Sequence, residues 1–229
     1  MKSIQCLVLV LILVGTANAQ NYTFYDTGAV WGQFYLGYIV NTNDIQNTSM
    51  KHMSNDTING KVYARVDRIG TAYTGDYKRL MFRDSAGYVY RSFLDTTSGG
   101  PNPIKLEHLI YNFNLQVGDT FMVPQGYIPN LQYIVFDVSM VTLLDGSTRK
   151  QILLVDDPLS PFADTIKWIE GIGDAEAGHW GRDFNIDSGW GLSCYSSANG
   201  IAVSNNYIYW PCDSNLLAGG YHPQTMFPR

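Results

Sequence analysis

Turn-forming residue pairs recur along this chain, and each stands between two stretches that alternate apolar and polar residues. The pairs are Asn59-Gly60, Asp145-Gly146 and Asn199-Gly200. Such dipeptides close two-residue β-hairpins, because both positions accept a positive φ. Ser85-Ala86-Gly87 predicts a further turn, between residues 77–83 and 88–94. A series of hairpins at short spacing predicts antiparallel sheet.

The longest alternating run, residues 131–143, predicts a strand with Ile134, Phe136, Val138 and Met140 on one face. Other segments are expected as follows: strands within 22–40 and at 61–69, 148–155, 167–170, 192–195, 201–203 and 207–210; a strand or one helical turn at 106–113; and a loop over the polar residues 41–54.

The composition supports the same fold class. Sixteen Tyr and only three Glu disfavour helices and favour strands. No amphipathic stretch has the length of a helix. We therefore predict an all-β, single-domain fold that is antiparallel and rich in hairpins, either a sandwich or an irregular barrel.

The first nineteen residues have the pattern of a removable export signal. Lys2 supplies a positive charge, residues 7–14 are an unbroken apolar run, and Ala17-Asn18-Ala19 fits the small-x-small cleavage rule. No later stretch is long and apolar enough for a membrane span. We expect a signal peptide over 1–19, a secreted domain over 20–215 in the periplasm or outside the cell, and a poorly structured tail over 216–229.

The formal net charge is −5, and removing the one charge of Lys2 makes it −6. This excess of negative charge argues against nucleic acid and against an anionic membrane surface as partners.

Export leaves Cys194 and Cys212 as a pair in an oxidising compartment, which predicts a disulfide between them. Two free thiols are the alternative. A zinc site is disfavoured, because no second Cys or His pair stands at ligand spacing.

The stretch 167–194 contains three of the five Trp and two of the three Glu. Glu170, before Gly171 and Gly173, fits either an ordinary turn or an acid in a ligand-binding loop. Glycoside hydrolysis needs two carboxyls about 5–10 Å apart. Partners for Glu170 in that role are Asp174, Glu176 and Asp183. His179 fits a general base or a solvent-facing turn residue.

Aromatic rings in the same stretch fit sugar binding, because flat rings stack on apolar sugar faces. Trp180 and Trp190, which lie among glycines, are candidates for such a platform together with Trp210. Filling the core is the alternative for all three, and Trp168 is expected to lie in the core.

Asp183, Asn185 and Asp187 alternate as oxygen ligands do in the first half of a calcium loop. The match is incomplete, because glycine comes one position late, at Gly189, and the twelfth position is Cys194 instead of Glu. An ordinary strand edge is the alternative, and no other cofactor is expected.

Four segments together resemble motifs of a known group. They are Asp56-Thr57-Ile58-Asn59-Gly60-Lys61-Val62-Tyr63, the run from Leu109 to Phe121 that contains Val117-Gly118-Asp119-Thr120, Asp145-Gly146-Ser147-Thr148-Arg149-Lys150, and Trp168-Ile169-Glu170-Gly171-Ile172-Gly173 with the later Leu192-Ser193-Cys194. In this order they resemble uncharacterised secreted β-proteins of Bacteroidota, many of which are predicted cargo of the type IX secretion system. The resemblance spans about residues 56–212 and implies export and a β-rich fold, without a catalytic residue. We expect no C-terminal sorting domain of the kind usual in such proteins after Cys212.

We therefore expect a secreted, non-enzymatic β-domain that binds a glycan or a protein. One alternative is a glycosidase-like secreted hydrolase that uses Glu170 or His179 with a nearby Asp. Another is a structural or adhesion module. Exposure of Trp180 or Trp190 in a groove favours the binder, two carboxyls at bonding range favour the hydrolase, and buried Trp side chains favour the structural module.

Overall fold

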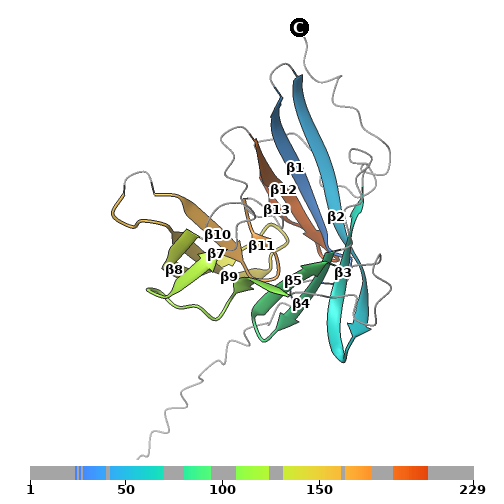
Figure 1. Cartoon of the computed structure of the whole chain (residues 1–229), viewed down its shortest axis with the longest axis horizontal. Helices are drawn as coiled ribbons and strands as arrows, with labels where there is room; N and C mark the ends of the chain where they lie inside the picture. Colours follow the sequence, from blue (N-terminus) through green and yellow to red (C-terminus); the bar gives the residue numbers. More distant parts are fainter. Residues whose placement is uncertain are drawn as a thin grey trace, which may run out of the picture.

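The computed structural model describes residues 24, 26, 28–39, 42–69, 80–93, 107–123, 131–160, 163–176 and 188–205. These residues form strands and no helix, which confirms the all-β prediction (Figure 1). A helix with the length and apolarity of a membrane span is therefore also lacking among them.

The larger sheet has eight antiparallel strands in the order β13-β12-β1-β2-β3-β4-β5-β6 and curls into half of a barrel. Its strands are β1 (Val30–Ile39), β2 (Thr42–Ile58), β3 (Lys61–Ile69), β4 (Leu80–Ser85), β5 (Tyr88–Phe93), β6 (His108–Asn112), β12 (Ser188–Ser197) and β13 (Gly200–Ser204). The hairpins β2–β3, β4–β5 and β12–β13 join neighbours that are close in sequence, whereas β12 returns from late in the chain to pair with β1.

The smaller sheet has five antiparallel strands in the order β11-β10-β9-β8-β7. They are β7 (Thr120–Val123), β8 (Leu131–Thr142), β9 (Thr148–Val155), β10 (Thr165–Ile169) and β11 (Gly173–Asp174). In Figure 1 this sheet lies to the left of β1, β2 and β12. Residues between β6 and β7 connect the two sheets.

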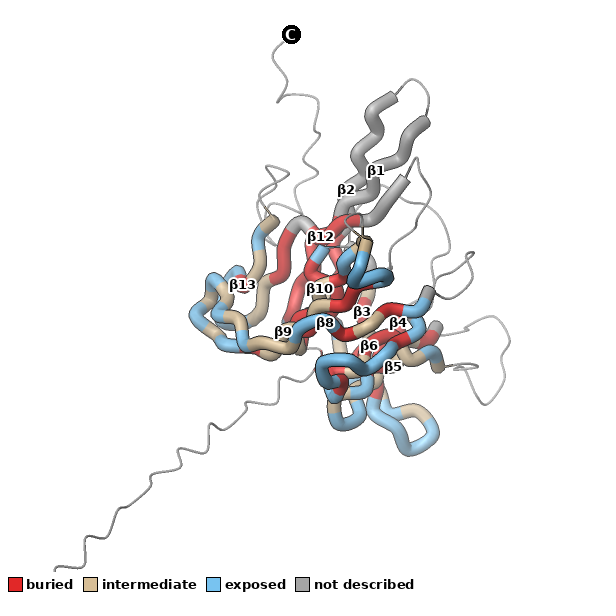
Figure 2. The backbone as a smooth tube through the Cα atoms, turned by 90° about the vertical axis from the view of Figure 1, so that its left-hand side faces the viewer, coloured by how far each residue is buried: buried red, intermediate tan, exposed pale blue. Residues whose placement is uncertain are grey.

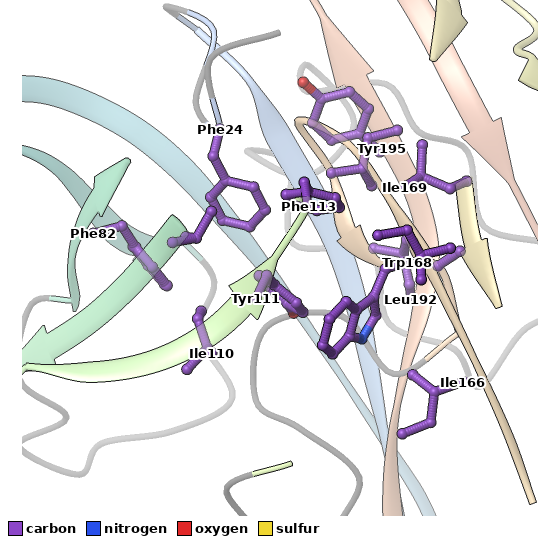
Figure 3. Packing of buried hydrophobic residues seen from close by; sticks show 14 of the residues in the cluster. Phe24, Phe82, Ile110, Tyr111, Phe113, Ile166, Trp168, Ile169, Leu192 and Tyr195 are labelled. Atoms are coloured by element: carbon purple, nitrogen blue, oxygen red, sulfur yellow. The ribbon is translucent and has the colours of Figure 1, made fainter. Parts of the chain in front are cut away.

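Both sheets contribute to one hydrophobic core (Figures 2 and 3). Trp168 of β10 is 1% exposed. Its ring meets Tyr111 of β6 edge-on at 5.2 Å and Phe121 of β7 edge-on at 4.9 Å, between ring centroids. Tilted and edge-on contacts of this kind are the favoured packing of aromatic rings. The prediction that Trp168 lies in the core is confirmed.

Two of the predicted turns, at residues 59–60 and 86–87, close hairpins with positive φ values. Asn59 and Gly60 have φ of 52° and 75°, and Ala86 and Gly87 have φ of 53° and 83°. Successive positive φ values give the turn whose twist matches that of the two flanking strands. The strands predicted at 61–69 and 148–155 coincide with β3 and β9, and 106–113 contains a strand, not a helical turn.

The predicted loop over 41–54 is wrong, because residues 42–54 belong to β2. Residues 42–51 of β2 pair with β1, and residues 49–58 pair with β3. Pairing with a neighbouring strand overrides the weak strand preference of its Asn, Asp and Ser residues.

The prediction that Ile134, Phe136, Val138 and Met140 lie on one face of β8 is also wrong. Phe136 is 57% exposed and Met140 is 62% exposed, whereas Tyr133 and Val135 are buried. The register between β8 and β9 shifts between Val135 and Asp137. A bulge of one residue reverses the alternation of the side chains that follow it.

Candidate functional site

Within the stretch 167–194, residues 169–173 form a tight turn between β10 and β11. Ile172 N–H donates to the Ile169 carbonyl at 2.9 Å. Gly171 and Gly173 have φ of 77° and 96°. Side-chain-bearing residues rarely adopt such values, so the two glycines allow the chain to reverse here. After the turn, Asp174 pairs with Trp168.

This turn is hydrogen-bonded to the larger sheet at two buried points. The indole Nε1 of Trp31 donates to the Ile172 carbonyl at 3.1 Å, and the Asp174 N–H donates to the Tyr111 hydroxyl at 3.2 Å. A Cβ added to Gly173 would lie 2.8 Å from the Tyr111 hydroxyl oxygen. Glycine is therefore required here both by its φ and by the close approach of the ring.

Glu170, the one predicted acid in this turn, is half-buried. Burial raises the pKa of its carboxyl, and the Asp84 carboxylate adds to this, while Lys150 and Arg149 oppose it. The Lys150 ammonium donates to the carbonyl oxygens of Phe113 at 2.7 Å and Leu115 at 3.4 Å. The carboxyl is thus in an environment that favours the protonated form relative to a carboxyl in water.

Asp84, at the end of the β4–β5 hairpin, is the carboxylate that acts on Glu170. Its two oxygens accept the backbone N–H groups of Gly87 at 3.2 Å and Phe24 at 3.0 Å. When two neighbouring carboxyls have different surroundings, one can act as a general acid and the other as a general base. The sequence analysis missed Asp84, because it lies 86 positions before Glu170 and only the fold brings it near.

The partners proposed from sequence for Glu170 have other contacts. Asp174 is 5% exposed, and its Oδ1 accepts the Glu176 N–H at 2.8 Å. Glu176 is exposed, and its carbonyl accepts the Leu192 N–H of β12. Asn205 Nδ2 also donates to the carbonyls of Ala175 at 2.9 Å and Leu192 at 2.6 Å. These bonds tie β11 to β12, so this part of the chain joins the two sheets.

Arg149 of β9 lies beside the same turn and is 1% exposed. Its Nη1 donates to the Glu170 carbonyl at 3.4 Å, and its Nη2 is 3.8 Å from Asp26 Oδ2. The guanidinium carbon lies 5.5 Å from the centroid of the Tyr195 ring. Burial removes water from the arginine charge, and the acidic and aromatic neighbours offset this cost.

A second polar cluster lies over β3, β4 and β5. The Glu107 carboxylate accepts Lys61 Nζ at 2.8 Å, the Tyr63 hydroxyl at 2.9 Å, and Arg83 Nε at 2.7 Å and Nη2 at 3.1 Å. The Arg83 guanidinium also lies 4.2 Å from the Tyr90 ring centroid. Hydrogen bonding by Arg83 is the main reason that the pKa of Glu107 is lowered to about 2. Sequence spacing gives no sign of this cluster, which ties the start of β6 to β3 and β4.

Several predicted site residues are not tested by the structure. His179, Trp180, Asp183, Asn185, Asp187 and Cys212 lie outside the described residues. Trp190 belongs to β12, where it pairs with Tyr35 of β1. Cys194 is buried in β12, but its pairing with Cys212 stays a prediction. Within the described ranges no three His, Cys, Asp or Glu residues gather as metal ligands.

No protein-family model matches the chain, and no match was found among curated proteins or among solved structures.

Proposed function

We propose that this chain is a secreted, non-enzymatic β-domain that binds a glycan or a protein outside the cytoplasm. The carrying observation is the register of β12 on β1, which sets Trp190 directly opposite Tyr35 and Gly191 opposite Phe34. Residues opposite each other in an antiparallel pair have Cβ atoms only about 4.5–5.5 Å apart. Two aromatic residues in such a pair supply the kind of area on which sugars stack.

The location of this pair supports the proposal. β1 pairs with β12 on one side and with β2 on the other, so the Trp190–Tyr35 pair belongs to the larger sheet, whereas Trp168 belongs to β10 of the smaller sheet (Figure 1). The Trp residues whose side chains are described, Trp31 and Trp168, are both buried. The turn at 170–173 is hydrogen-bonded to the larger sheet, so its glycines and its conformation can be explained without a catalytic role.

A glycan array that compares the wild type with Trp190→Ala and Tyr35→Ala tests the carbohydrate form of the proposal. We expect binding to a subset of glycans, lost in both variants. Phe136→Ala is the matched control, because it removes an aromatic ring that is 57% exposed on the smaller sheet. Equal signal from every glycan, or unchanged binding by Trp190→Ala, would exclude carbohydrate binding at this pair.

One observation favours a hydrolase as the second candidate. Glu170 has a raised pKa, chiefly because of burial, and the Asp84 carboxylate and Lys150 act on it. General acids are tuned in this direction. Hydrolysis of a panel of chromogenic glycosides that is abolished by both Glu170→Gln and Asp84→Asn would support this candidate, and the same rate in Glu170→Gln would remove it.

A further inference from the structure

The short segment before β1 contacts both sheets, through the side chains of Phe24 and Asp26. Phe24 is 0% exposed, and its ring centroid lies 5.2 Å from that of Tyr111, 6.2 Å from Phe82 and 6.3 Å from Phe113. Figure 3 shows the ring between Phe82 and Phe113. The Phe24 N–H donates to Asp84 Oδ2 at 3.0 Å. This end of the segment is therefore held by the larger sheet and the residues that follow β6.

The other end is held by the smaller sheet. The Asp26 carboxylate lies 3.8 Å from Nη2 of Arg149, which is buried in β9. The Asp26 carbonyl accepts the Ala29 N–H at 2.9 Å, which closes a turn at the exposed Gly28, where φ is +83°. β1 begins only at Val30, directly after this turn.

These contacts have the form of peptide recognition. An aromatic ring is fully desolvated among other rings, one backbone N–H is bound by a carboxylate, and an acid two positions later faces a buried arginine. Buried aromatic anchors and charged partners of this kind account for most of the affinity in protein–peptide complexes. None of the described residues before Val30 belongs to a strand.

We infer that Phe24 and Asp26 are the two anchors of a peptide ligand bound in cis. Their binding site is formed by Phe82, Tyr111 and Phe113, with Asp84 and Arg149 at its two ends. The site recognises an aromatic residue followed two positions later by an acidic residue, and the chain's own N-terminal segment is its occupant. This inference does not depend on the proposed function.

The test uses the full chain with a protease recognition sequence inserted between Thr27 and Gly28. The chain is folded first and then cut at this insertion, so that only non-covalent contacts hold the N-terminal peptide. We expect the cut peptide to co-elute with the domain in gel filtration. An excess of a synthetic peptide of residues 20–27 should displace it, with saturable rebinding.

Variant peptides separate the contributions of the two anchors. Replacing Phe24 with Ala in the peptide should weaken binding about a hundredfold, as expected for removing a buried aromatic side chain. Replacing Asp26 with Asn should weaken binding only about two- to fivefold, because this pair is long and Asp26 is 37% exposed. A scrambled peptide of the same composition is the control and should not compete.

Two results would overturn the inference. One is a cut domain that stays folded, releases its N-terminal peptide and does not rebind it. The other is equal competition by the Phe24→Ala peptide. If cutting unfolds the domain, excess wild-type peptide should restore its native tryptophan fluorescence, and failure to do so also counts against a peptide-binding site.

Discussion

The indole nitrogen of Trp31 and the carbonyl oxygen of Ile172 are 3.1 Å apart, although 141 positions separate the two residues in the chain. Trp31 is in the second position of β1, and Ile172 is in the turn before β11. This buried bond joins the larger sheet to the smaller one at the most distinctive motif of the sequence. The motif therefore has a structural task that does not require catalysis.

Trp31→Phe should lower the free energy of unfolding by about 1–3 kcal/mol, because it leaves a buried carbonyl without this donor. The measurement is urea unfolding followed by circular dichroism. Leu159→Ala, at a position that is 92% exposed, is the control and should change stability by less than about 0.5 kcal/mol. Equal effects of the two substitutions would show that the bond does not stabilise the fold.

Gly173→Ala should cost more stability than Gly118→Ala. Both glycines have a similar positive φ, of 96° and 90°, so both substitutions strain the backbone. Only at Gly173 would the new Cβ meet another group, the Tyr111 ring, since nothing lies within 4 Å of the corresponding position at Gly118. We expect an additional loss of about 1–3 kcal/mol, typical of overpacking. Thermal unfolding of the two variants provides the comparison, and equal losses would contradict the close contact.

The Glu107 cluster should contribute to acid sensitivity. Its carboxyl has a pKa of about 2 in the folded protein, against an ordinary value of 4.5. A lowered folded-state pKa gives stability that is present above 4.5 and is lost as the pH falls towards 2. At about 1.4 kcal/mol per pKa unit, the loss is at most about 3.5 kcal/mol. Unfolding free energies of the wild type and Glu107→Gln should converge across this range, and parallel curves would contradict this account.

Glu170 should show the opposite pH dependence, because burial raises its pKa in the folded state. A raised carboxyl pKa makes the folded state most stable below the unfolded pKa, and this advantage is lost as the pH rises through the folded value. Glu170→Gln should therefore be at least as stable as the wild type at pH 8, with a smaller gain at pH 4. A variant that is clearly less stable at pH 8 would show that its contacts with Lys150 outweigh burial.

Local signals in the sequence predicted much of the fold. Asn59-Gly60 and Ala86-Gly87 set their own backbone conformation, so the hairpins that they close followed from the residues alone. The loop predicted over 41–54 failed because residues 42–51 pair with β1 and residues 49–58 pair with β3, and local residue preferences do not reveal these pairings. The bulge after Val135 depends on the pairing of β8 with β9, which composition does not reveal.

The candidate site was only partly predictable for the same reason. Glu170 was found because it stands in a glycine-rich turn at the end of a strand. Asp84, Arg149 and Lys150 reach that turn from other hairpins, and no sequence spacing connects them with it. Contacts between distant segments are fixed by the packing of the two sheets, not by local preference.

Hydrogen exchange of the Trp31 indole N–H, followed by NMR, tests most directly whether this turn holds the two sheets together. We predict that this proton exchanges only as fast as the backbone amides of the most protected core strands, because its release requires the sheets to separate. Rapid exchange of the indole proton while the amides of β1 and β10 stay protected would contradict this account.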